Sequence, residues 1–183
     1  RKSGVNYLDF INALATDFHF ESISAEVDGD TANEMIANAQ QYIEVGSNVT
    51  IKLPLTREGL SACKVLTDDG IETNVTLCFS VAQAIMAAKA GATYISPFIG
   101  RLNDNSFSGV ELVRSISGLY CGQGVRTRIL AASLRDVHHV SRCLLYGANV
   151  VTLPPGVFDK MYNHVLTDSG LNIFEQDFAQ IKA

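Results

Sequence analysis

Segments with the alternation of a β-strand and segments with the periodicity of an α-helix follow one another along almost the whole chain. The strand-like runs lie at about 19–27, 48–55, 72–78, 93–96, 127–133 and 149–153. The helical patterns lie at about 6–17, 31–45, 57–69, 80–90, 107–120, 135–146, 154–163 and 168–180. Strands that alternate with helices in this way favour a parallel sheet and an α/β fold. No glycine-rich phosphate loop or dinucleotide fingerprint follows any of these strands, which disfavours a P-loop or Rossmann fold.

Residues typical of helix ends stand at the borders of these segments. Hydroxyl or carboxyl side chains that can cap a helix precede three of the helical patterns, at Asp30 or Thr31, at Thr56 and at Ser80. Gly91 and Gly147 each end a helical pattern just before a strand. Glycine accepts the left-handed conformation that commonly closes a helix, so both positions support the repeated βα unit.

Lys52 is a lone ammonium in the strand-like run 48–55. Because strand side chains alternate between faces, Lys52 shares one face with Thr50, while Val49, Ile51 and Leu53 occupy the other. By the same alternation, Ser22, Ser24 and Glu26 lie on one face of their strand and their apolar neighbours on the other. Asn74 and Thr76 likewise share the polar face of the strand at 72–78. In a parallel sheet covered by helices, such polar faces converge on a common interior, as at the catalytic end of a barrel. An exposed lysine on an edge strand is the alternative.

The composition sets limits on the fold and on the partners. With 183 residues, of which 47% are hydrophobic and 18% charged, the chain can form a single domain over residues 1–183. Its formal net charge of -5 offers no basic field for nucleic acid. No apolar stretch reaches the roughly 20 residues that span a bilayer, so we expect a soluble protein with no membrane partner.

Cysteine and histidine do not form a recognisable metal pattern. The four cysteines, at positions 63, 78, 121 and 143, include no Cys-x-x-Cys pair, and we interpret them as small apolar residues of a protein in a reducing cytoplasm. His138 and His139 are adjacent, so on a helix they point about 100° apart and do not share a metal easily. They are expected at a surface or helix start, and no metal is predicted.

Six motifs follow one another along the chain: SAEV at 24–27, IKLPLTREGL at 51–60, GIETNVTLCFS at 70–80, AAKAGATYISPFIGRL at 87–102, AASLR at 131–135 and LPP at 153–155. Together they resemble the transaldolase family, and more narrowly its short subfamily that includes fructose-6-phosphate aldolase. The resemblance implies a (β/α)8 TIM barrel, class I Schiff-base chemistry without a metal or cofactor, and ring-shaped oligomers. Six strands are counted where a closed barrel has eight. We therefore expect the family's first two strands, with an acid/base aspartate, to lie upstream of residue 1.

The resemblance also implies a role for individual residues. The family's Schiff-base lysine falls on Lys52, the glutamate that orders a catalytic water falls on Glu26, and its threonine partner falls on Thr76. The substrate-binding positions fall on Asn74 for the bound intermediate, Ser96 for a substrate hydroxyl, Phe98 for an aromatic wall, and Arg101, Ser133 and Arg135 for phosphate.

Three functions remain open from the sequence. The first is a transaldolase of the pentose phosphate pathway, which converts sedoheptulose 7-phosphate and glyceraldehyde 3-phosphate to erythrose 4-phosphate and fructose 6-phosphate. The second is a fructose-6-phosphate aldolase that releases dihydroxyacetone. Glutamate rather than glutamine at 26, and phenylalanine rather than tyrosine at 98, resemble the transferase branch. The third is a non-catalytic sugar-phosphate-binding barrel, which the intact Lys52, Glu26 and Thr76 disfavour.

The C-terminal segment predicts self-association. Ile173, Phe174, Phe178 and Ile181 fall near one stripe of a helix beyond the last expected barrel helix. A stripe of this kind needs a covering surface. A neighbouring subunit is the expected partner, and packing on its own barrel is the alternative.

Overall fold

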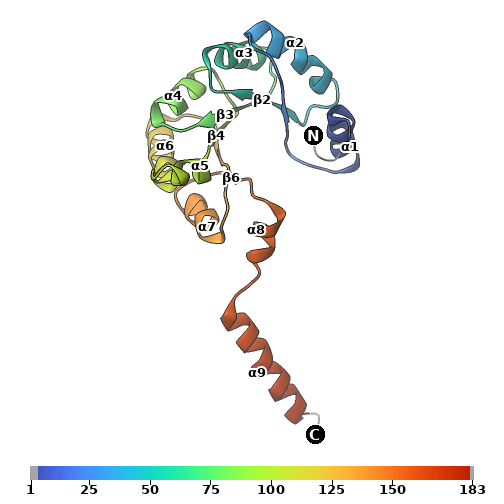
Figure 1. Ribbon diagram of the computed structural model, residues 1–183, viewed down its shortest axis with the longest axis vertical. Helices are drawn as coiled ribbons and strands as arrows, with labels where there is room; N and C mark the ends of the chain where they lie inside the picture. Colours follow the sequence, from blue (N-terminus) through green and yellow to red (C-terminus); the bar gives the residue numbers. More distant parts are fainter. Residues whose placement is uncertain (1–3, 182–183) are drawn as a thin grey trace.

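A computed structural model describes residues 4–181. Its centre is a parallel sheet of six strands in sequential order, which curls into part of a barrel with helices along its outer face (Figure 1). The strands are β1 (Ile23–Glu26), β2 (Val49–Pro54), β3 (Thr73–Cys78), β4 (Tyr94–Pro97), β5 (Arg128–Ala131) and β6 (Val150–Val151). The expected α/β fold with parallel strands is confirmed. Within the described residues, β1 and β6 are the edges of this partial barrel.

Most of the helices match the sequence pattern, and all of the described helices but the first and the last two lie between successive strands. They are α1 (Tyr7–Asp17), α2 (Ala32–Ile43), α3 (Arg57–Asp68), α4 (Val81–Lys89), α5 (Ile99–Asp104), α6 (Gly109–Gln123), α7 (Val137–Leu145), α8 (Pro155–Lys160) and α9 (Val165–Ile181). The sequence pattern missed α5, because a helix of six residues is too short to show a period. The sequence pattern also predicted longer strands than the observed β1 and β6, because hydrogen bonds to the neighbouring strand determine where a strand ends.

The predicted helix ends are confirmed. Thr31 forms a capping box with Glu34, and the hydroxyls of Thr56 and Ser80 accept hydrogen bonds from the third residue of their helices. Gly91 and Gly147 have φ angles of 88° and 96°, which an L side chain rarely adopts. The chain therefore leaves α4 and α7 and enters the next strand through turns that favour glycine.

The apolar faces of the strands form the core under the helices. Ala25, Ile51, Val75 and Ile95 are completely buried on the helix side of the sheet. On the opposite side, backbone pairing aligns Glu26 with Lys52, and Lys52 with Asn74. This register puts the predicted polar face of each strand inside the curl.

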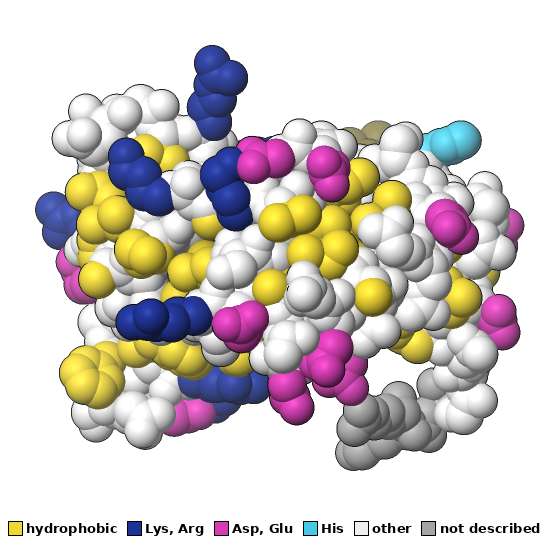
Figure 2. Space-filling model, turned by 90° about the horizontal axis from the view of Figure 1, so that it is seen from above, with side chains coloured by type: hydrophobic (Ala, Val, Ile, Leu, Met, Phe, Trp, Pro, Cys, Tyr) yellow, Lys and Arg dark blue, Asp and Glu magenta, His cyan; other side chains and the backbone are white. Residues whose placement is uncertain are grey.

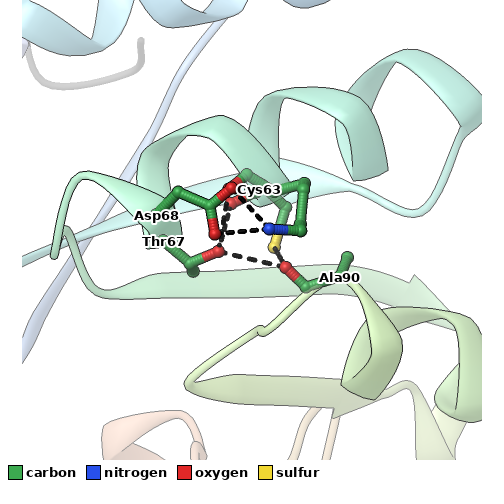
Figure 3. Close-up of polar contacts among 5 residues, drawn as sticks. Cys63, Thr67, Asp68 and Ala90 are labelled. Atoms are coloured by element: carbon green, nitrogen blue, oxygen red, sulfur yellow. Dashed lines mark hydrogen bonds and ion pairs between the residues drawn. The ribbon is translucent and has the colours of Figure 1, made fainter.

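Helix α3 is fixed against the end of α4 by its hydroxyl and thiol side chains (Figure 3). The Thr67 hydroxyl donates to the Ala90 carbonyl at 3.0 Å, and the Cys63 Sγ lies 3.8 Å from the same oxygen. Burial raises the pKa of the Cys63 thiol, which keeps it protonated and unreactive. Cys63, Cys78 and Cys143 are buried as expected of small apolar residues, whereas Cys121 is exposed.

The outer surface is mixed in character, and α9 stands apart from it. From above, Lys and Arg side chains gather toward one side, Asp and Glu lie mainly over the rest, and hydrophobic side chains are exposed among them (Figure 2). Helix α9 extends away from the sheet and has no buried residue (Figure 1). Among the described helices, none has the length and apolar character needed to cross a membrane.

Candidate active site

A cavity of about 490 Å³ lies on the inner face of the sheet, where residues of the strands and of the segments that follow them line it. It is lined by Ser24, Lys52, Asn74, Thr76, Ser96, Phe98, Leu130, Ala132, Ser133 and Thr152. Six of the nine residues predicted from the sequence are therefore brought together in this one cavity. A larger groove of about 860 Å³ lies outside, between α3 and α4, and none of the nine lines it. Polar groups that converge in a concave site at strand ends favour the inner cavity as the functional one.

Lys52 and Glu26 meet at the edge of this cavity. They are register partners on adjacent parallel strands, and Glu26 Oε2 lies 2.9 Å from Lys52 Nζ. The lysine side chain is 25% exposed and the glutamate side chain 66% exposed. Lys52 is thus on an interior strand of the sheet, not on an edge strand as in the alternative interpretation. The backbone N–H of Glu26 donates to the Tyr7 hydroxyl at 3.0 Å, which links α1 to the end of β1.

Asn74 is held in one orientation by two serines. Its Nδ2 donates to Ser24 Oγ at 3.1 Å, and its Oδ1 accepts from Ser96 Oγ at 2.7 Å. Asn74 and Ser96 are each 2% exposed, so the amide is prearranged in a nearly dry interior. Ser24 was recognised in the sequence as part of the polar face of β1, but its contact with Asn74 depends on the curvature of the sheet.

Thr76 points into the cavity from an irregular stretch of β3. The pairing of β3 with β4 shifts between Val75 and Cys78, and Leu77 has a φ of 65°. Such bulges re-aim side chains and are concentrated near functional sites. The Thr76 hydroxyl is buried and has no hydrogen-bond partner among residues 4–181, so it is available to a ligand or to water.

An aromatic and cationic group forms the rim of the cavity. Phe98 packs edge-on against Phe79, with ring centroids 6.0 Å apart. The guanidinium carbon of Arg101 lies 4.8 Å from the centroid of the Phe98 ring. Phe79 was not predicted as a site residue. Its place beside Phe98 depends on how the loop after β3 meets the end of β4.

The three residues predicted to bind phosphate lie on two chain segments that touch. The N–H of Gly100, next to Arg101, donates to the Ser133 carbonyl at 3.1 Å. A Cβ at position 100 would lie 2.3 Å from that oxygen, so the close approach requires glycine. Ser133 itself has a φ of 60°. Helix α5, which follows β4, and the loop after β5 thus bring Arg101, Ser133 and Arg135 into one region.

Arg135 already has an acidic partner. Its two terminal nitrogens donate to the Asp104 carboxylate at 2.6 and 2.7 Å, and these bonds hold the pKa of Arg135 above its usual value. Asp136 caps α7 by accepting from the His139 N–H. Asp136 thus occupies the His139 amide at the start of α7, so this N–H group is not free to bind an anion.

Within residues 4–181, no group of three or more His, Cys, Asp and Glu side chains is placed to hold a metal ion.

Known proteins resemble this chain over nearly its whole length. The family model described as "Transaldolase/Fructose-6-phosphate aldolase" matches residues 6–183. A "Probable transaldolase" of Caulobacter vibrioides is 52% identical over 178 residues, which cover 97% of this chain and 82% of the relative. A "Probable transaldolase" of Dinoroseobacter shibae is 54% identical over 156 residues, which cover 85% of this chain and 72% of the relative.

A solved structure is similar in fold alone. GMP reductase C318A from Trypanosoma brucei, in complex with guanosine 5'-monophosphate, aligns with a TM-score of 0.55 at 18% identity. The alignment covers 74% of this chain and 30% of that chain. The curled parallel sheet is thus shared with a protein of quite different sequence. The matches in sequence go further than the fold, and they confirm the resemblance seen in the motifs: this chain belongs to the transaldolase/fructose-6-phosphate aldolase family.

Proposed function

We propose that this protein is a transaldolase that transfers a dihydroxyacetone unit between sugar phosphates through a Schiff base on Lys52. The observation that carries the proposal is the position of Lys52, an amine on the inner face of the sheet in a cavity lined by Asn74, Thr76 and Ser96. Lys64 and Lys89 lie on the outer helices α3 and α4. Among the described residues that line the cavity, Lys52 is the one lysine.

The proposed reaction begins with attack of the neutral Lys52 amine on the ketone carbon of the donor. The Glu26 carboxylate, 2.9 Å from Nζ, is placed to accept the proton that the ammonium must lose. The carbinolamine then loses water to give an iminium ion. Through water, Glu26 and the free Thr76 hydroxyl would supply and remove the protons of these steps.

Cleavage follows from the electron demand of the iminium ion. The C3–C4 bond of the sugar breaks, its electron pair moves toward the iminium nitrogen, the C4 hydroxyl loses its proton, and an aldehyde leaves. The remaining three-carbon enamine then attacks the carbonyl carbon of a second aldehyde, and hydrolysis releases the new ketose. Asn74, fixed between Ser24 and Ser96, would hydrogen-bond the bound intermediate. Phe98 would form an aromatic wall of the site, and Arg101, Ser133 and Arg135 would bind phosphate.

The transferase is favoured over the lyase by two side chains that stand in the site. Glu26 contacts Lys52, and Phe98 lies at the rim of the cavity. Glutamate and phenylalanine at these positions resemble the transferase branch of the family. On this proposal the natural reaction belongs to the pentose phosphate pathway of the cytoplasm.

The proposal extends to the assembly of the protein. The six parallel strands would form, with two more, a (β/α)8 barrel to which residues 1–183 contribute as one domain. Helix α9 would then pack on a neighbouring subunit, because Ile173, Phe174, Phe178 and Ile181 are all more than half exposed.

Borohydride trapping tests the central step. The full-length protein is incubated with fructose 6-phosphate, reduced with borohydride, digested and examined by mass spectrometry. We expect a stable adduct on the peptide that contains Lys52 and none on the peptides that contain Lys64 or Lys89. An adduct on another lysine would contradict the assignment, and no adduct at all would favour a non-catalytic binding protein. Release of free dihydroxyacetone without an acceptor would identify the aldolase instead.

A further inference from the structure

A chain of side-chain hydrogen bonds through His139 connects α5 to the start of α7. Asn103 on α5 has its Nδ2 3.2 Å from His139 Nε2. The other ring nitrogen, Nδ1, contacts Asp136 Oδ2. The His139 side chain is 31% exposed and lies outside the cavity that contains Lys52. The chain joins the two segments that carry Arg101 and Arg135.

The direction of each bond in this chain is fixed by Gly109. The N–H of Gly109 donates to Asn103 Oδ1 at 3.0 Å, so the nitrogen of the Asn103 amide faces the histidine. An amide nitrogen can only donate, and His139 Nε2 must therefore accept. The neutral ring then carries its proton on Nδ1, directed at Asp136. Burial of Asp136 opposes its charge, but the hydrogen bonds from the His139 backbone and side chain outweigh this and hold the pKa of Asp136 below its usual value.

This bond differs from the other side-chain link between the same segments. The Arg135 guanidinium donates two hydrogen bonds to the carboxylate of Asp104, the residue next to Asn103. A phosphate that engages the Arg135 guanidinium competes with the Asp104 carboxylate for the same donors, so this link weakens as the ligand binds. The Asn103–His139 bond involves no group proposed to bind phosphate. It can hold α5 to α7 in both the free and the bound state.

We propose that His139 is a positioning residue for phosphate binding. By accepting from Asn103, it holds α5, and Arg101 with it, against the segment that carries Ser133 and Arg135. The arginines then keep their spacing when Arg135 turns from Asp104 to the ligand. The inference rests on the proposed function, since the expected ligand is the phosphate of a sugar phosphate.

Two substitutions separate this role from packing. In His139→Gln, the side-chain oxygen can take the place of Nε2 and accept from Asn103. In His139→Asn, the shorter amide reaches toward Asp136 alone. We expect His139→Asn to raise the KM for fructose 6-phosphate about three- to tenfold, the range for loss of one hydrogen bond, and to change kcat by less than about twofold. His139→Gln should restore the KM. His138→Asn, on the exposed neighbour, is the matched control and should resemble the wild type.

Calorimetric titration of the full-length protein with inorganic phosphate gives a second measurement that does not depend on the Schiff base. We expect His139→Asn to weaken phosphate binding by the same factor of about three to ten, and His139→Gln to leave it unchanged. Asn103→Ala should weaken it at least as much as His139→Asn, because it also removes the acceptor of the Gly109 N–H, and the double variant should be no worse than Asn103→Ala alone.

Each contrary result has a distinct meaning. An unchanged KM and phosphate affinity in His139→Asn would overturn the inference. Equal losses in the Gln and Asn variants would show that the ring acts only by packing, and absence of phosphate binding to the wild-type protein would also refute it. If the wild-type protein binds phosphate but traps no imine, the proposed function fails, while the titrations still decide the role of His139.

Discussion

Glu26 and Lys52 face each other across the β1–β2 ladder, with carboxylate oxygen and ammonium nitrogen 2.9 Å apart. With the Glu26 side chain 66% exposed, an ion pair of this kind contributes only about 0–1 kcal/mol to stability. Its contact with the proposed nucleophile is thus of more consequence for proton transfer than for folding.

Replacement of Glu26 by glutamine separates these two roles. Glu26→Gln removes the group that is proposed to accept and return protons. We expect the kcat of the transfer reaction to fall by about 10²- to 10⁴-fold. The melting temperature should change little, because the ion pair is largely exposed. Steady-state kinetics and thermal unfolding of the same preparation check both statements. Glu21→Gln, at an exposed carboxylate paired with Arg128 outside the cavity, is the control and should keep full activity. A Glu26→Gln variant with normal kcat would remove Glu26 from the mechanism.

Thr76 should show a conflict between stability and function. Its buried hydroxyl has no partner among the described residues, and valine has nearly the same shape. We expect Thr76→Val to raise the free energy of unfolding by up to about 1 kcal/mol, because an unsatisfied polar group is removed. Activity should fall at the same time, since Thr76 and Glu26 are the two side chains proposed to transfer protons through water. Denaturant unfolding and kinetics test this, and a variant that is both less stable and fully active would be the opposite of the expectation.

Arg135 should discriminate between phosphorylated and unphosphorylated substrates. A charge-assisted hydrogen bond is worth about 1.5–3 kcal/mol, so Arg135→Ala should lower kcat/KM for fructose 6-phosphate about 10- to 150-fold. The loss with fructose as donor should be much smaller. Arg114→Ala, which removes an exposed arginine from α6, provides the control. Equal losses for both donors would assign Arg135 a structural role through Asp104.

Gly100 is expected to tolerate no side chain. A Cβ there would lie 2.3 Å from the Ser133 carbonyl oxygen, so Gly100→Ala must push α5 away from the strand ends. We expect a loss of about 1–3 kcal/mol in the free energy of unfolding and a weaker phosphate site. Gly118→Ala on α6 is the matched control, because no atom lies within 4 Å of its Cβ position. It should stabilise the protein by up to about 1 kcal/mol. Similar stability of the two variants would contradict the close approach.

The exposed stripe of α9 predicts the assembly state. In the full-length protein, we expect Phe174→Asp with Phe178→Asp to reduce the number of subunits seen by light scattering, and deletion of residues 171–183 to do the same. A charge in a buried apolar contact has no partner and is costly. Gln176→Asp, on the same helix, introduces one such charge at a different angle and should leave the assembly intact. A wild-type monomer at micromolar concentration would disprove self-association.

Local sequence patterns predicted the faces of the strands and, apart from the short α5, the order of the elements. Alternation within each strand is a local property, so the placement of Lys52, Asn74 and Thr76 on the inner face followed from parity alone. The caps at Thr31, Thr56 and Ser80 are equally local, because each binds the backbone three residues away. The motifs gave the family, which the relatives confirmed.

Which of these polar groups are in contact depends on the tertiary structure. The pairing of Glu26 with Lys52 depends on the strand register, and the Ser24–Asn74–Ser96 contacts depend on how far the sheet curls. The bulge at Leu77 depends on how β3 pairs with β4. The Arg135–Asp104 ion pair and the Asn103–His139 hydrogen bond join residues that are far apart in the sequence, where no local pattern predicts a contact. Local periodicity reports the direction in which a side chain points. Its partner is fixed by long-range packing, and the chemistry of the site depends on that partner.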